Sequence, residues 1–187
     1  FADKVDAAHV EEQVISAGHF HGMPLALAMS YVKASIPVLA SISERRLNKL
    51  VDPATNDGLP AFLIGNEDGT ESGHMIVQYT AAAIVHDLAS RAHPASVFSI
   101  PTSANAEDHV SNSTWCGRKA RTIVENTETI VAGEILMATQ ALSLVADLAK
   151  DHPIGSGSRA ALEAVRKVID PALSGDRWYG IEMQQAL

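Results

Sequence analysis

Apolar residues recur at helical spacing along most of the chain. Between residues 23 and 51 they fall three or four positions apart, which aligns them on one face of an α-helix. Pro37 lies inside this segment and should kink the helix, because proline has no N–H group. Asp52 and Pro53 then end it. The residues that we expect on its buried face are Leu25, Met29, Val32, Ile36, Leu39 and Ile42.

The same periodicity predicts two further long helices. One covers residues 73–91, after a polar loop at residues 54–72 around a short apolar cluster, and its expected buried residues are Ile76, Val77, Ala81, Ile84, Val85 and Leu88. The other covers residues 105–149 and carries two adjacent heptad tracks, which are Ile123, Ile130, Met137, Leu144 and Val124, Val131, Ala138, Val145. A helix of about 45 residues would be about 65 Å long. Such a length predicts an elongated bundle shared between subunits.

Shorter helices are expected towards the C-terminus. Residues 152–158 break the chain, and an amphipathic helix follows at residues 159–169, ended by Pro171. Its inward side chains should be Leu162, Val165, Val168 and Ile169. One or two helical turns should occupy residues 176–187. We therefore predict one all-α region, in which residues 1–22 form a loop or strand entry, 23–150 a long-helix bundle and 151–187 short helices.

Composition agrees with this fold and narrows the function. Of the 187 residues, 47% are hydrophobic but only 5% aromatic, which favours helices packed on helices. The net charge of −8 argues against a nucleic-acid or anionic-membrane partner. The single cysteine, Cys116, excludes an internal disulfide and fits a buried packing position in a cytoplasmic protein. No signal peptide is visible, and Lys33 and Pro37 interrupt the most apolar run, so we expect no membrane span.

Two short stretches carry candidate chemistry. Asn105, Glu107, Asp108 and His109 lie within five residues. The simplest interpretation is an acidic helix start, capped by Asn105 or by a nearby serine, with both carboxylates near the positive end of the helix dipole. Further upstream, His19 and His21 would share one face of an extended segment, a spacing that can ligate a metal. Because the sequence fixes no third ligand, we predict no metal site, and a helical metalloprotein stays a minor alternative.

The stretch around Glu107 also resembles a known family. Pro-Thr-Ser-Ala-Asn-x-Glu-Asp-His-Val-Ser, at residues 101–111, is similar to the signature of the histidine ammonia-lyase branch of the aromatic amino acid lyases. Other segments agree in the same order, and they are residues 14–24, 41–46, 75–83, 92–97 and 118–126. The resemblance covers roughly residues 10–148 and reaches about the C-terminal third of such an enzyme. In the family Phe1 would fall within a domain, so we expect either a proteolytic piece or a separately encoded subunit.

The resemblance implies an activity, a cofactor and an assembly. The family eliminates ammonia from an amino acid, here from histidine to give urocanate or from a related aromatic amino acid. Its electrophile is methylideneimidazolone, formed from Ala-Ser-Gly, and that tripeptide is absent from this sequence. We therefore expect the prosthetic group on an N-terminal portion or partner chain of the same lyase. The family assembly is a homotetramer whose active sites combine residues from several subunits.

The resemblance also nominates residues for the site. Glu107 matches the glutamate that faces the substrate imidazole, which makes it the candidate catalytic and substrate-binding residue. Phe20 matches a side chain beside the prosthetic group, and His19 and Asn105 complete the predicted substrate-binding set. The sequence departs from the family pattern at Ala106, where glutamine is usual, and at Phe98, where aspartate is usual. Two rivals follow: an aminomutase or lyase for another aromatic or imidazole amino acid, and a catalytically decayed structural subunit.

Overall fold

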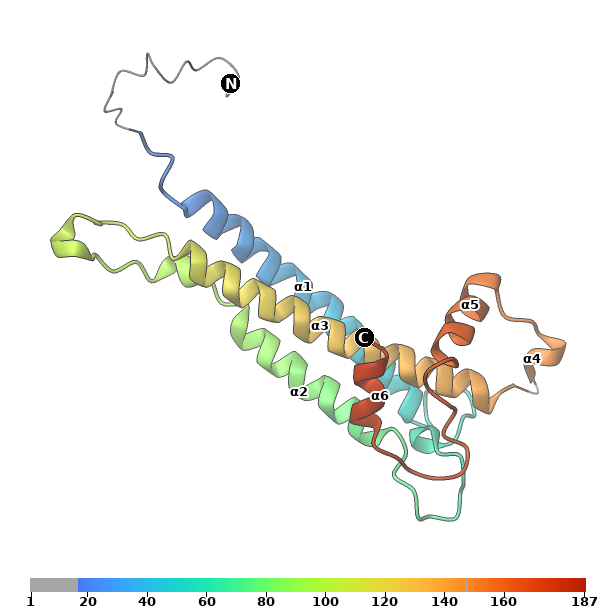
Figure 1. The fold of residues 1–187 in the computed structure, drawn as a ribbon. Helices are drawn as coiled ribbons and strands as arrows, with labels where there is room; N and C mark the ends of the chain where they lie inside the picture. Colours follow the sequence, from blue (N-terminus) through green and yellow to red (C-terminus); the bar gives the residue numbers. More distant parts are fainter. Residues whose placement is uncertain (1–16, 147) are drawn as a thin grey trace, which may run out of the picture.

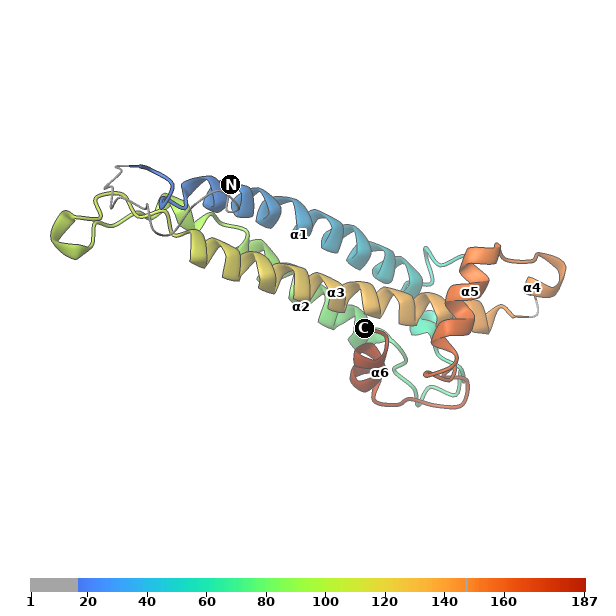
Figure 2. The same cartoon turned by 45° about the horizontal axis from the view of Figure 1, so that its top comes forward.

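The protein is an elongated bundle of three long helices (Figures 1 and 2). The computed structural model describes residues 17–146 and 148–187. The described helices, in chain order, are α1 (Met23–Val51), α2 (Met75–Arg91), α3 (Ser113–Leu144), α4 (Leu148–Asp151), α5 (Ser156–Val165) and α6 (Tyr179–Gln185). Three 3₁₀ turns join them, and these are η3 (Ala61–Leu63), η4 (Ala95–Val97) and η5 (Ser103–Asn105). Within the described ranges there is no β-sheet, and the all-α prediction is confirmed. Most of the expected entry segment, residues 1–16, lies outside the described residues.

Heptad spacing organises the core. A buried residue recurs every seven positions on α1 and on α3, as in helices that pack side by side. These residues are Ala26, Lys33, Ala40 and Leu47 on α1, and Cys116, Ile123, Ile130 and Met137 on α3. The two alanines let the helices approach closely, and α1 makes its most extensive contacts with α3. Helix α2 adds Val77, Ala81 and Leu88 to the same core.

The predicted bounds of α1 are confirmed, but three of the six residues predicted on its buried face are exposed, whereas Met29 and Ile36 do pack against the core. Leu25 is 65% exposed, Leu39 is 59% exposed and Ile42 is 48% exposed. The small side chains of Ala26 and Ala40 occupy the narrow seam instead, because a large side chain there would push the helices apart. Leu25, Leu39 and Ile42 consequently face outwards, whereas Leu47 and Val51 are buried near the end of the helix. Pro37 lies inside the helix as predicted.

Helix α3 begins eight positions later than predicted, at Ser113 rather than residue 105. The residue before it, Asn112, has a left-handed backbone with φ 54°, which interrupts any helix arriving from upstream. Glu107 and Asp108 therefore do not lie in a first helical turn, and Asn105 does not cap the helix. The 32 residues of α3 still span about 48 Å at 1.5 Å per residue.

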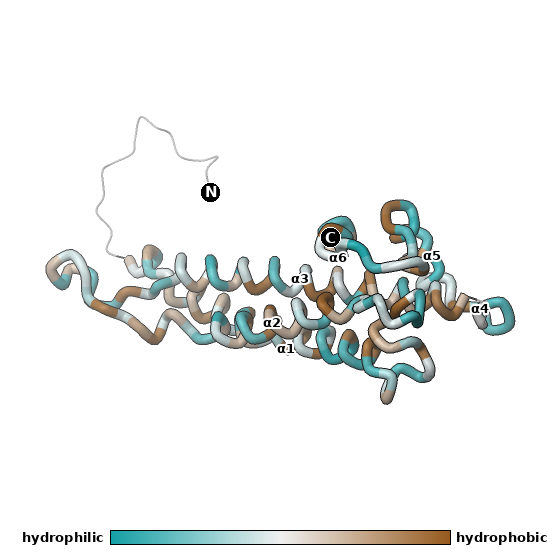
Figure 3. Tube along the Cα trace, turned by 90° about the horizontal axis from the view of Figure 1, so that it is seen from below, coloured by the Kyte–Doolittle hydropathy of each residue, from teal (hydrophilic) through white to brown (hydrophobic). Residues whose placement is uncertain are grey.

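Only one of the two predicted heptad tracks on α3 is buried in this chain. Ile123, Ile130 and Met137 are fully covered, whereas Val124 is 38% exposed and Val131 is 41% exposed. Val124 and Val131 line a groove of about 530 Å³ between α1 and α3, together with three residues of these helices. We call the five apolar residues Ile36, Leu39, Val124, Val131 and Ile135 the apolar flank. Figure 3 shows further apolar stretches on the long helices. On α2, Ile76 is 58% exposed, so its predicted burial is also wrong.

The C-terminal segment folds back onto the bundle. Helix α5 begins and ends earlier than predicted, and Val168 is 60% exposed, whereas Ile169 is buried as expected. Helix α6 confirms the expected final turns, and it lies against α3 in Figures 1 and 2. The buried Gln140 of α3 fastens this segment, because its side-chain amide donates to the carbonyls of Leu63 and Ala172 over 3.2 and 2.8 Å. Its oxygen accepts from the N–H of Ala172 over 2.9 Å.

By length and apolar composition alone, α1 meets the requirements of a membrane-crossing helix. Its most apolar 18-residue window has a mean hydropathy of 1.6, and 17% of that window is buried in this chain. Lys33 and Pro37 thus do not exclude a span on composition, contrary to the expectation. One such helix is weak grounds for a membrane, since core helices of soluble proteins have the same composition. Lys33 is fully buried and its Nζ donates to the carbonyl of His93 over 3.3 Å.

Candidate functional site at the open end of the bundle

A tight turn precedes α1 and carries Phe20. The N–H of His21 donates to the carbonyl of Gly18 over 3.2 Å, so this segment is a turn rather than the predicted extended strand. We call residues 18–21 the Phe20 turn. The Phe20 side chain is 81% exposed, and His19 is exposed beside it. Across the described residues, no group of three His, Cys, Asp or Glu side chains could hold a metal ion.

Glu107 lies on a narrow hairpin between η4 and α3. We call residues 99–112 the Glu107 loop. Thr102 and Glu107 exchange two backbone hydrogen bonds, of 3.0 and 3.3 Å. The tip between them holds three consecutive left-handed residues, Ser103, Ala104 and Asn105, with φ of 53°, 51° and 68°. Each costs about 1–2 kcal/mol in a residue that has a Cβ, and such strain gathers at functional sites.

The base of the Glu107 loop is anchored to the bundle. The side-chain amide of Asn112 donates to the carbonyls of Ala95 and Phe98, over 3.3 and 3.2 Å. The hydroxyl of Ser99 accepts from the N–H of Val110 over 2.8 Å. Below the loop, the buried Cys116 packs with Ala26 and Ala95, which confirms its predicted packing role. Burial also lowers the pKa of the Lys33 amine in this region.

The structure brings the Phe20 turn and the Glu107 loop to the same end of the bundle (Figures 1 and 2). We call this the open end. The contact runs through two histidines, since Nε2 of His21 lies 2.9 Å from the carbonyl oxygen of His109 and the rings stack at 5.8 Å. Sequence reasoning assigned no role to His21 beyond the metal pair and none to His109, although both lie in the motifs. The contact between these two histidines is seen only in the structure.

The four predicted site residues are all exposed in this chain, and they are Phe20, His19, Asn105 and Glu107. Their segments meet through His21 and His109, and none of the four lines a described pocket. The Glu107 carboxylate can accept hydrogen bonds from a polar or cationic group, and the Phe20 ring offers an apolar face.

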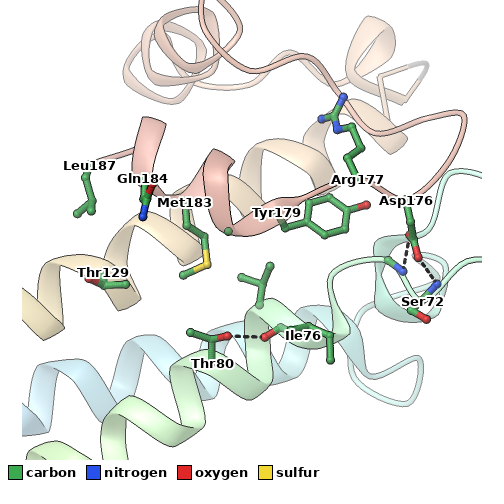
Figure 4. Close-up of a pocket in the computed structure, with 13 residues that line it drawn as sticks. Ser72, Ile76, Thr80, Thr129, Asp176, Arg177, Tyr179, Met183, Gln184 and Leu187 are labelled. Atoms are coloured by element: carbon green, nitrogen blue, oxygen red, sulfur yellow. Dashed lines mark hydrogen bonds between the residues drawn. The ribbon is translucent and has the colours of Figure 1, made fainter.

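A second hollow lies away from the open end, between α2, α3 and α6 (Figure 4). Its volume is about 490 Å³. At one side the Asp176 carboxylate accepts from the N–H groups of Ser72 and Gly73 over 2.7 and 2.8 Å. Nearby, the fully covered His74 ring packs on Tyr179 at 4.3 Å between centroids. Burial lowers the pKa of His74 to about 4 and raises that of Tyr179 to about 12. No sequence motif indicated this cluster.

Comparison with known proteins gives the family of the chain. The sequence model of the family described as "Aromatic amino acid lyase" matches residues 4–167. The histidine ammonia-lyase of Natranaerobius thermophilus is 53% identical over 167 residues, which are 89% of this chain and 32% of the relative. That of Symbiobacterium thermophilum is 48% identical over the same shares. This chain thus spans about a third of the length of these curated relatives.

Solved structures match over nearly the whole chain. The crystal structure of histidine ammonia-lyase from Trypanosoma cruzi has a TM-score of 0.86 at 37% identity, covering 95% of this chain and 34% of that one. Tyrosine aminomutase from Streptomyces globisporus has a TM-score of 0.85 at 30% identity, covering 94% and 32%. The chain therefore belongs to the aromatic amino acid lyase family.

Proposed function

We propose that this chain is part of an ammonia-lyase that eliminates ammonia from histidine to give urocanate. The observation that carries the proposal is the placement of Glu107 on a strained hairpin beside the Phe20 turn. The identity of 53% to a histidine ammonia-lyase supports the choice of substrate. In this proposal Glu107 is the catalytic residue and also binds substrate, together with Phe20, His19 and Asn105.

The side chains of the open end have distinct tasks in this reaction. The Glu107 carboxylate accepts a hydrogen bond from the substrate imidazole and orients it, and it can take up a proton there. The Phe20 ring supplies an apolar wall, and the amide of Asn105 and the ring of His19 supply polar contacts. All four are exposed at one end of the bundle, which suits a site completed by another part of the assembly.

The chemistry also needs an electrophile, because the β-proton of an amino acid is only weakly acidic. We infer that methylideneimidazolone, formed from an Ala-Ser-Gly tripeptide on the N-terminal portion or a partner chain, supplies it. The exposed Phe20 ring and Asn105 amide fit one flank of such a polar heterocycle. The atoms of the group come from outside this chain in this proposal, since the tripeptide is absent from the sequence.

We further propose that the lyase is a cytoplasmic homotetramer. The apolar flank and the outward-facing Leu25 and Ile42 of α1 leave a long apolar surface uncovered in the single chain. Surfaces of this kind mark protein–protein interfaces. The buried free thiol of Cys116 fits a reducing compartment.

A second candidate function is an aminomutase for an aromatic amino acid. The similarity to tyrosine aminomutase favours it, at 30% identity and a TM-score of 0.85. An aminomutase would share the site but return a β-amino acid instead of releasing ammonia. A decayed structural subunit, the third possibility, is favoured by Ala106 in place of the family's glutamine.

The test uses the complete enzyme, assembled from this chain and the portion that carries Ala-Ser-Gly. With histidine we expect urocanate and ammonia, and Glu107→Gln should lower kcat by about 10²–10⁴-fold. Glu163→Gln is the matched control, because Glu163 is an exposed carboxylate on α5, far from the open end. Unchanged kinetics in Glu107→Gln would remove Glu107 from the mechanism. A β-amino acid product would favour the aminomutase, and no turnover of any aromatic amino acid would favour the structural subunit.

A further inference from the structure

Both nitrogens of the His21 ring are engaged, one with its own segment and the other with the Glu107 loop. The N–H of Met23 donates to Nδ1 over 3.3 Å, so that nitrogen is an acceptor. Nε2 lies 2.9 Å from the carbonyl oxygen of His109, which can only accept, so Nε2 carries the hydrogen and donates. This assignment follows from the hydrogen-bond network. The ring therefore bridges the start of α1 to the Glu107 loop.

Two further contacts press the same segments together. The rings of His21 and His109 stack with an angle of 12° between their planes. Next to them, Gly22 lies so close to the start of α3 that a Cβ would come within 2.3 Å of the Ser113 hydroxyl and 3.0 Å of the Ser111 hydroxyl. The Phe20 turn thus sits directly on the C-terminal arm of the Glu107 loop.

The rest of the loop has few restraints beyond its base. Residues 101–109 are all exposed, and the tip holds three strained residues. Glu107 lies two positions before His109, and its backbone is paired with Thr102 in the hairpin. A restraint at His109 consequently fixes the arm that carries the Glu107 carboxylate.

We propose that His21 is a positioning residue, whose ring holds the Glu107 loop against the Phe20 turn so that the two parts of the candidate site keep one geometry. The inference rests on the proposed function for the role of Glu107. His21 acts through the loop and touches no reacting atom in this proposal. Asn112 and Ser99 anchor the loop base independently, so loss of His21 loosens the loop without unfolding the bundle.

Two substitutions separate the hydrogen bonds from the ring. His21→Phe keeps an aromatic ring to stack on His109 but removes both polar contacts. His21→Gln keeps an acceptor and a donor in one side chain, at nearly the spacing of the two imidazole nitrogens. His152→Phe is the matched control, since His152 is an exposed histidine between α4 and α5.

The first measurement is amide hydrogen exchange of residues 99–112 in the complete enzyme. We expect exchange roughly tenfold faster in His21→Phe, and exchange near the wild-type rate in His21→Gln and His152→Phe, because local opening sets the rate. Unchanged exchange in His21→Phe would overturn the proposal. This readout needs no substrate, so it stands even where the proposed lyase activity fails.

The second measurement is a kinetic cycle with histidine as the substrate. A loosened carboxylate should lower kcat/KM about 10–100-fold in His21→Phe, given the sensitivity of catalysis to misplacements of about 1 Å, and His21→Gln should restore most of it. If His21 acts through Glu107, adding His21→Phe to Glu107→Gln causes no further loss. Fully additive losses would overturn the positioning role.

Discussion

The two ends of the bundle differ in how far this chain covers their side chains. At the end near α5 and α6, which we call the closed end, the buried amide of Gln140 is hydrogen-bonded to Leu63 and Ala172. His74 is buried there against Tyr179, although its Nδ1 has no hydrogen-bond partner. At the open end, the Phe20 turn and the Glu107 loop expose their side chains, and the loop tip is strained. The chain itself covers much of the closed end, whereas the open end presents its side chains to solvent. Residues that carry chemistry are commonly held in such exposed, less stable segments.

The largest predicted effect compares two adjacent residues of α3, one covered by the chain and one uncovered. Ile130 is fully buried, whereas Val131 on the apolar flank is 41% exposed. Ile130→Asp should destabilise this chain by more than about 4 kcal/mol, because an unpaired carboxylate would be buried. Val131→Asp should cost less than about 1 kcal/mol in the single chain, yet should disrupt the proposed tetramer.

Urea unfolding and native mass spectrometry separate these two outcomes. A Val131→Asp variant that unfolds like Ile130→Asp would show that the apolar flank belongs to the core of the chain. A Val131→Asp variant that still assembles to the wild-type size would show that the apolar flank is not an interface.

An intermediate effect is expected at the closed end when the pH falls. The pKa of His74 is about 4 in the folded protein, because burial disfavours the charged ring, and about 6.5 in an unfolded chain. Between these values the unfolded state binds more protons, so the stabilisation is complete above pH 6.5 and is lost as the pH falls to 4. The expected loss is about 3 kcal/mol. It is measured as the difference between wild type and His74→Phe in unfolding free energy from pH 7 to pH 4.

That difference should shrink steadily with acid, whereas His152→Phe should leave the wild-type pH dependence unchanged. Parallel curves for wild type and His74→Phe would mean that the His74 ring is accessible to protons in the folded state. The closed end would then be less tightly sealed than its packing indicates.

The smallest predicted effect tests the backbone strain at the tip of the Glu107 loop. Ala104 has φ 51°, whereas Ala106, two residues later, has an ordinary helical backbone with φ −63°. Ala104→Gly should stabilise the folded conformation of the Glu107 loop by about 0.5–1 kcal/mol, because glycine adopts a positive φ without strain. Ala106→Gly should destabilise it by a similar amount. Amide exchange of residues 99–112 reports both changes, and equal signs for the two variants would refute the strained tip.

Sequence patterns predicted where the helices lie better than which of their faces is buried. The bounds of α1 followed from apolar spacing and from the Asp52-Pro53 stop. Its core face did not, because Ala26, Lys33 and Ala40 do not stand out in a search for large apolar residues. The start of α3 was missed because nothing local distinguishes a left-handed Asn112 from a helical one.

The candidate site was predicted to a similar degree. Motif resemblance nominated Phe20 and Glu107, and the fold brings their segments to the same end of the bundle. The contact between His21 and His109 joins residues far apart in the sequence, so no local pattern could reveal it. The same holds for the His74 and Tyr179 pair at the closed end.

The single cysteine of this chain can report local opening of the bundle. Cys116 is fully buried in the first turn of α3, against Ala26 and Ala95, and its sulfur lies 3.7 Å from the Ser30 hydroxyl. A thiol reagent can reach it only when the seam between α1 and α3 separates near the open end. Since these 187 residues hold no other thiol, the labelling rate of this chain reports how often the two helices separate there.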